Sequence, residues 1–134
     1  MTESESNADP LRRALLGALP LLALAQRAGA QDAVTVQPQS YRVVLENDRV
    51  RVLEYNSRPG MGVCGNGLHS HPAHLSVLLS GARVRETTAD GKVIEPGTKP
   101  LGTVFWSEAV THVTENLGSY DTRCLLVELK SAHA

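Results

Sequence analysis

The chain has 134 residues, enough for one domain, and its contents of 42% hydrophobic and 20% charged residues are ordinary for a soluble globular protein. Aromatic residues make up only 4%, so a core must be built mainly from Val, Leu and Ala. The 13 basic and 14 acidic side chains give a net charge of −1. Since nucleic-acid-binding proteins show a clustered basic excess, this balance argues against nucleic acid as a partner.

The first 30 residues differ in character from the rest of the chain. Arg12 and Arg13 precede an apolar run at 14–25, whose 12 residues are too few to span a bilayer. Small residues at 28 and 30 then form a site at which a signal peptidase could cut before Gln31. A charged start, a short apolar run and a small-residue cleavage site are typical of a secretory signal peptide.

This pattern predicts a signal peptide at 1–30 and one mature domain at 31–134 that has no membrane span and is periplasmic or secreted. Arg12 and Arg13, followed by Ala-Leu-Leu, also resemble a twin-arginine export signal, although Leu11 stands where Ser or Thr is usual. The alternative is an N-terminal helix in a cytoplasmic protein, and Pro20 argues against a regular helix there.

Strand-like sequence follows from Val34 onward, without helical periodicity. Asp90-Gly91 predicts a hairpin with a two-residue turn. Many short strands separated by Gly and Pro turns predict an all-β sandwich or barrel. The expected strands are 41–46, 50–55, 74–80, 82–88, 92–95, 103–106, 110–115 and 121–130, the last with Leu125, Val127 and Leu129 on one face.

Four histidines carry the main chemical signal of the sequence. His69 and His71 are two residues apart, so on a strand their side chains share one face. His74 follows, and His112 lies 38 residues further along the chain. Several neutral imidazoles that converge can fill a coordination sphere, and three of them leave positions open for water or substrate. We expect His69, His71 and His112 to hold one divalent metal ion, with His74 either a fourth ligand or a residue at the rim.

These histidines lie in segments that resemble the two cupin motifs. Residues 67–81, GLHSHPAHLSVLLSG, are similar to the first motif, and residues 102–116, which end in His, three residues and Asn, are similar to the second. The resemblance covers about 41–130 and is strongest to small single-domain cupins whose last strand ends like VELK at 127–130. It implies a single cupin jelly-roll barrel with a metal inside, bound by His69, His71 and His112.

The chain departs from these motifs at two places. His74 stands in the slot where the first motif commonly has Glu, and residues 108–110, EAV, replace the Pro-x-Gly that usually precedes the histidine of the second. The site is therefore more neutral, and it resembles three- or four-histidine cupins more than the oxalate-active type.

The resemblance leaves two kinds of function open. One is a metal-dependent oxidoreductase of dioxygenase-like chemistry that uses Fe, Mn, Ni or Zn and a small-molecule substrate. The other is an exported binding module for a metal or small ligand that performs no reaction. By analogy with cupins that pair edge to edge, the strands at 41–55 would form a homodimer.

Other residues have weaker claims on the site. Tyr55, Arg51 and Arg123 are candidates for polar walls of a pocket, and Phe105 and Trp106 either line it or fill the core. Cys64 and Cys124 could form a disulfide in an exported protein or remain two buried thiols.

Overall fold

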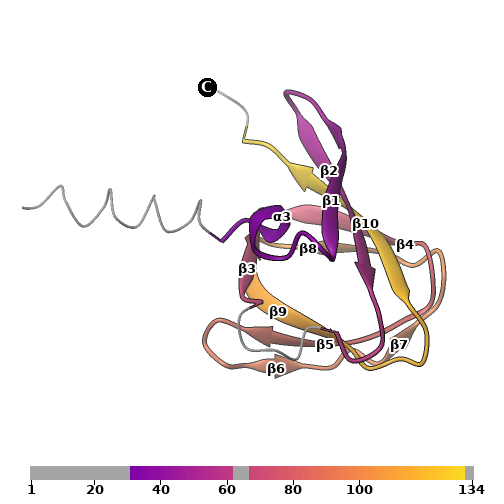
Figure 1. Ribbon diagram of the computed structural model, residues 1–134. Helices are drawn as coiled ribbons and strands as arrows, with labels where there is room; N and C mark the ends of the chain where they lie inside the picture. The colour runs from indigo at the N-terminus through magenta and orange to yellow at the C-terminus, as the bar shows by residue number, and fades with distance from the viewer. Residues whose placement is uncertain (1–30, 62–66, 132–134) are drawn as a thin grey trace, which may run out of the picture. The chain divides into compact units, whose positions relative to one another are not determined.

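The computed structural model describes residues 31–61 and 67–131, which form two antiparallel sheets (Figure 1). In spatial order, the first sheet contains β1 (Tyr41–Glu46), β2 (Val50–Ser57), β10 (Thr122–Leu129), β4 (His74–Leu78) and β8 (Val104–Ser107). The second contains β3 (His69–His71), β9 (Val110–Asn116), β5 (Ala82–Thr88) and β6 (Val93–Ile94), and β7 (Thr98–Lys99) pairs with β5. The prediction of an all-β domain is confirmed. Within the described ranges, no helix is long and apolar enough to cross a membrane.

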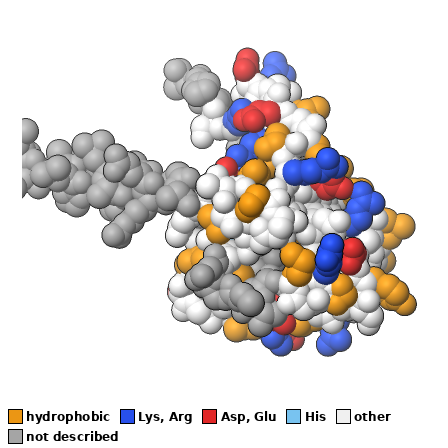
Figure 2. Space-filling model, in the orientation of Figure 1, with side chains coloured by type: hydrophobic (Ala, Val, Ile, Leu, Met, Phe, Trp, Pro, Cys, Tyr) orange, Lys and Arg blue, Asp and Glu red, His pale blue; other side chains and the backbone are white. Residues whose placement is uncertain are grey.

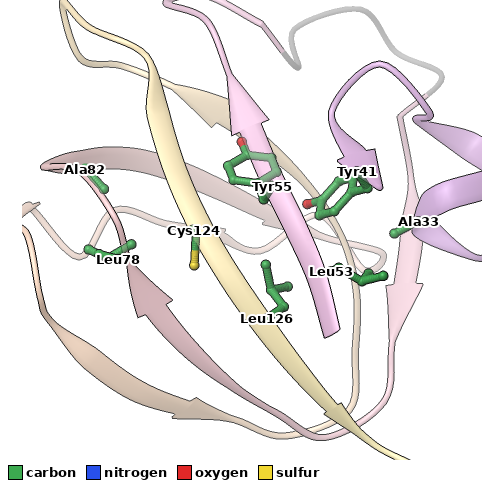
Figure 3. Close-up of a cluster of buried hydrophobic side chains, with 8 residues drawn as sticks. All are labelled: Ala33, Tyr41, Leu53, Tyr55, Leu78, Ala82, Cys124 and Leu126. Carbon is green, nitrogen blue, oxygen red and sulfur yellow. The ribbon is translucent and has the colours of Figure 1, made fainter. Parts of the chain in front are cut away.

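The barrel interior holds a small apolar core beside a group of imidazoles. Tyr41 and Tyr55 lie with ring centroids 4.9 Å apart, and Leu126 and Cys124 project from β10 into the same space (Figure 3). The remaining members of this cluster are Ala33, Leu53, Leu78 and Ala82. Because four buried histidines share the interior, the apolar core occupies only part of the barrel.

Strand β10 shows which face of the first sheet points inward. The three aliphatic residues that alternate in its sequence, Leu125, Val127 and Leu129, do share a face, but it is the outer one, and Leu129 is 46% exposed. The buried residues of the strand are Thr122, Cys124, Leu126 and Glu128. The inner face is therefore the more polar one, which already indicates a site rather than a purely structural core.

The segment that precedes β1 was expected to be extended from Val34 onward, and this prediction is wrong. Ala33–Val36 form a short helix, α3, in which the N–H groups of Thr35 and Val36 donate to the carbonyl of Asp32. Ala33 is fully buried in the core, and the backbone N–H of Ser70 on β3 donates to the carbonyl of Gln31. These tertiary contacts override the strand preference of the β-branched residues.

The β5–β6 hairpin forms at Asp90-Gly91, but its loop has three residues rather than two. Gly91 has φ +86° and donates its N–H to the carbonyl of Thr88, while no described residue other than glycine has positive φ. A two-residue type I′ turn needs positive φ at both central residues, and Asp90 does not adopt it. A type I turn closed by a left-handed Gly satisfies the same sequence at lower backbone strain.

Candidate metal centre

Three buried histidines lie close together on two neighbouring strands. His69 and His71 lie on the inner face of β3, and His112 on β9 is the direct cross-strand partner of His69. Their exposed fractions are 0%, 3% and 7%, and one ring nitrogen from each lies within 4.8 Å of the other two. The structure therefore brings together the three residues that the sequence analysis selected as metal ligands.

Hydrogen bonds at Nδ1 orient the two histidines of β3. Nδ1 of His69 donates to the carbonyl oxygen of Gly67 at 2.6 Å, and Nδ1 of His71 donates to Oε1 of Glu128 at 2.7 Å. A neutral imidazole that donates from Nδ1 keeps its lone pair on Nε2. Nε2 of His71 is buried without a hydrogen-bond partner among the described residues, and Nε2 of His69 accepts a 3.1 Å bond from the Tyr41 hydroxyl.

His112 has a carboxylate beside its Nδ1 as well. Oε1 of Glu86 on β5 lies 2.9 Å from this nitrogen, although the ring is not aligned for a straight hydrogen bond. The imidazole holds the pKa of Glu86 below its usual value. Nε2 of His112 is buried and unpartnered within the described structure. Metal-binding histidines typically have an acceptor behind one ring nitrogen and the metal in front of the other. His69 and His71 have such an acceptor, and His112 has a carboxylate close to Nδ1 without hydrogen-bond geometry.

Glu128 connects His71 to two ion pairs, both made by Arg51. Its Oε2 accepts a 2.9 Å bond from Nε of Arg51, and the two terminal nitrogens of Arg51 contact the carboxylate of Asp32 at 3.0 and 2.5 Å. Glu128 is only 2% exposed, so its charge needs these partners to be tolerated. Arg51 in turn lowers the pKa of Asp32 through the same hydrogen bonds.

Burial keeps the imidazoles of β3 neutral. Desolvation lowers the pKa of His69 to about 4, against a smaller opposing effect of its hydrogen bond to Gly67. Desolvation also lowers the pKa of His71, opposed by the hydrogen bond to Glu128. Because a metal ion binds only the unprotonated ring, these shifts favour metal binding at neutral pH.

His74 lies next to this group but is not part of the converging set. It begins β4, is 3% exposed, and its ring centroid is 5.2 Å from that of His71. Nδ1 of His74 donates to the carbonyl oxygen of Pro72 at 2.8 Å, which leaves Nε2 as its lone-pair nitrogen. The residue lines the cavity described next, so both of the roles expected for it, fourth ligand or rim residue, fit its position.

A cavity of about 140 Å³ lies beside the histidines, and two of the candidate wall residues line it. Tyr55 contributes its hydroxyl, which is 3.3 Å from Oγ1 of Thr114, and Phe105 is a partly buried wall residue. Arg51, Arg123 and Trp106 do not line the cavity. Arg123 pairs with Glu54, and Trp106 is 48% exposed.

The structure describes only one of the two cysteines that were expected to form a disulfide or to remain buried thiols. Cys124 is buried and lines the cavity, where desolvation raises the pKa of its thiol to about 11. Cys64, its proposed disulfide partner, lies outside the described residues.

Three residues at the site were not selected from the sequence: Tyr41, Glu86 and Glu128. Glu128 did carry a signal, since it is a charged residue at an inward position of a strand that is otherwise mostly apolar. Glu86 and Tyr41 have ordinary strand contexts, and only the three-dimensional pairing reveals them.

Comparison with known proteins indicates the fold. No protein-family model matches the chain, and no curated protein matches it in sequence. A cupin domain from Bordetella pertussis is 23% identical with a TM-score of 0.57, over 68% of this chain and 92% of that one. A cupin protein from Bacteroides fragilis is 18% identical over 71% and 80% of the two chains, with a TM-score of 0.48. A protein with a double-stranded β-helix domain from Klebsiella pneumoniae is 16% identical over 70% and 78%, with a TM-score of 0.47.

The low pKa of His69 predicts how the stability of the metal-free protein depends on pH. In the unfolded chain a histidine takes up its proton near pH 6.5, whereas folded His69 does so only near pH 4. Between these values the unfolded state binds more protons, so the free energy of unfolding falls as the pH is lowered. For this residue we expect a loss of about 2 kcal/mol between about pH 7 and about pH 5.

Urea unfolding with a chelator present measures this loss, and His69→Gln should reduce the difference between the two pH values. An unchanged pH dependence in the variant would show that His69 is not the group responsible.

Proposed function

Because the chain has the cupin jelly-roll fold, we propose that it is a metal-dependent cupin in which His69, His71 and His112 hold one divalent transition metal. The observation that supports this most directly is that Nε2 of His71 and Nε2 of His112 are buried and have no hydrogen-bond partner among residues 31–61 and 67–131. Leaving such atoms unpaired costs free energy, and a metal ion is a partner that satisfies them together with Nε2 of His69.

The donor set restricts the metal. Three neutral imidazoles suit Fe, Mn, Ni or Zn better than Mg or Ca, which prefer oxygen. Glu86 and Glu128 contact Nδ1 atoms, so they orient the ligands rather than bind the metal. When bound, the metal would supply a Lewis acid with open positions for a small molecule.

We propose dioxygenase-like chemistry on a small molecule as the reaction. The residues of this chain would bind the substrate in the cavity, where the hydroxyls of Tyr55, Thr114 and Ser76 can orient it and the apolar walls exclude water. Oxygen consumption by the metal-loaded protein, screened with small acids, diketones and thiols, tests the reaction. Metal binding without turnover of any of them would favour the alternative, a binding module for a metal or small ligand.

Metal content tests the proposed centre directly. Protein purified from its native compartment should contain about one equivalent of Fe, Mn, Ni or Zn by mass spectrometry, and His69→Ala/His71→Ala should lose it. Ser70→Ala is a matched control, because Ser70 lies between the two histidines but contacts Thr111 and Gln31 instead. Glu128→Gln should weaken metal affinity by about 10- to 100-fold, since it disturbs the acceptor behind His71.

No bound metal, or a metal content that the double variant leaves unchanged, would contradict the proposed centre.

We propose that the protein is exported to the periplasm or secreted, with cleavage before Gln31. Arg12 and Arg13 support the twin-arginine route, which would let the domain fold and bind its metal before export. We expect Arg12→Lys/Arg13→Lys to retain the precursor in the cytoplasm, measured by cell fractionation and the mass of the mature chain. Full export of this variant would refute the twin-arginine route.

We also propose that the protein is a homodimer that pairs through β1. This strand is at the edge of the first sheet, and its Val43, Val44 and Leu45 are each more than 40% exposed. Charged side chains of both signs gather near the tip of the β1–β2 hairpin (Figure 2), so the apolar segment has a polar border. A lysine on an edge strand blocks pairing. Val44→Lys should therefore convert the dimer to monomer in sedimentation velocity, and a wild-type monomer would overturn the proposal.

A further inference from the structure

The cavity beside the histidines extends along the barrel between the two sheets. On β4 its wall runs from His74 through Ser76 to Leu78, and on β5 it runs from Glu86 through Val84 to Ala82. Each of these strands advances about 3.3 Å per residue, so the two ends of the cavity are roughly 13 Å apart. The histidines therefore occupy one end of an elongated space.

The cavity is largely apolar and of limited size. Val84, Phe105 and Leu126 line it midway, Leu78 and Ala82 line the end away from His74, and Ser76 and Thr114 add hydroxyl groups to its wall. Its volume of about 140 Å³ is close to that of an engineered protein cavity that binds benzene. An apolar body of about one six-membered ring would fill it.

Lys99 lies near the end of the cavity opposite the histidines. Its cross-strand partner is Ala82, and its ammonium is 5.3 Å from the centroid of the Phe105 ring. No carboxylate of the described residues lies within 4.0 Å of this ammonium, whereas Lys130 pairs with Glu46 at 2.7 Å. Lys99 is half-buried, and the residues next to it at the cavity edge, Pro96 and Gly97, are exposed. A cation that has an aromatic ring but no carboxylate beside it, at the mouth of a largely apolar cavity, is suited to bind an anionic group.

We propose that the cavity binds a small monocarboxylate with an apolar body of ring size, and that Lys99 pairs with its carboxylate. The body lies among Leu78, Val84 and Phe105, and the end opposite the carboxylate points toward the histidines. The direction of this inner end rests on the proposed metal centre, whereas the apolar fit and the role of Lys99 do not. Lys99 is in this way the residue that determines specificity for an acid over a neutral molecule of equal size.

Calorimetric titration of the chelator-treated full-length protein tests this with two probes of similar size, benzoate and neutral benzyl alcohol. We expect benzoate to bind the more tightly. Lys99→Met should weaken benzoate about tenfold or more while leaving benzyl alcohol unchanged, and Lys99→Arg should retain most of the benzoate affinity. Ala82→Leu, which fills the space beside Lys99, should weaken both probes, and 2-naphthoate should be excluded by size.

Unchanged benzoate affinity in Lys99→Met would overturn the proposal, and so would equal binding of benzoate and 2-naphthoate or the absence of benzoate binding. Lys99→Met changes a half-buried surface residue, so its folding does not limit the test. Because the titration uses metal-free protein, its outcome is independent of the metal analysis. If the protein binds no metal but binds benzoate in a Lys99-dependent way, this inference stands and the proposed metal centre fails. If it binds metal but shows no Lys99-dependent benzoate binding, this inference fails and the metal centre stands.

Discussion

The burial of three imidazole rings in one small barrel is the constraint on which the rest of this structure depends. Each ring has two polar nitrogens that water would otherwise solvate, and leaving them unpaired in the interior costs free energy. Gly67 and Glu128 accept hydrogen bonds from Nδ1 of His69 and His71, and the carboxylate of Glu86 lies 2.9 Å from Nδ1 of His112. Nε2 of each ring lies in a common region, and of these three atoms only that of His69 has a hydrogen-bond partner in the part of the chain that the structure describes. One shared metal ion would give all three Nε2 atoms a partner, whereas hydrogen bonds would need a separate donor for each.

The acceptors create a second requirement, since two of them are carboxylates. Glu128 is buried, and an unpaired carboxylate in that place would cost several kcal/mol. Arg51 compensates it and is itself compensated by Asp32, which directly precedes α3. The segment before the first strand is thereby connected to a metal-ligand candidate through two ion pairs of Arg51 and the hydrogen bond from His71 to Glu128. Its local conformation follows from this connection more than from the strand preference of its own residues.

The strands and the histidine cluster could be predicted because both depend on short-range patterns. Alternation fixes which residues share a face, and the spacing of His69 and His71 places both rings on one side of β3. Alternation does not reveal which face is inward, and for β10 the apolar face is the outer one. The hydrogen-bond partners of the histidines could not be predicted from short-range patterns. Glu128 is 57 residues from His71 in sequence, and the pairing of β10 with β4 brings the two together. The helix α3 was missed for the same reason, since Ala33 is buried by contacts from other strands.

The ligand set and the cavity have consequences that follow from charge. Three neutral imidazoles do not balance a divalent cation, and Glu86 and Glu128 lie behind the rings rather than beside the metal position. With the metal bound as proposed, one end of the cavity would be positive, and Lys99 makes the other end positive as well. Between them the wall is mostly apolar, so these charges are screened less than they would be in water.

A small molecule with an anionic group gains from this field at either end. A neutral molecule of the same size gains only the apolar contacts. The selectivity of the cavity for acids would therefore come from the placement of charge at its ends rather than from its shape.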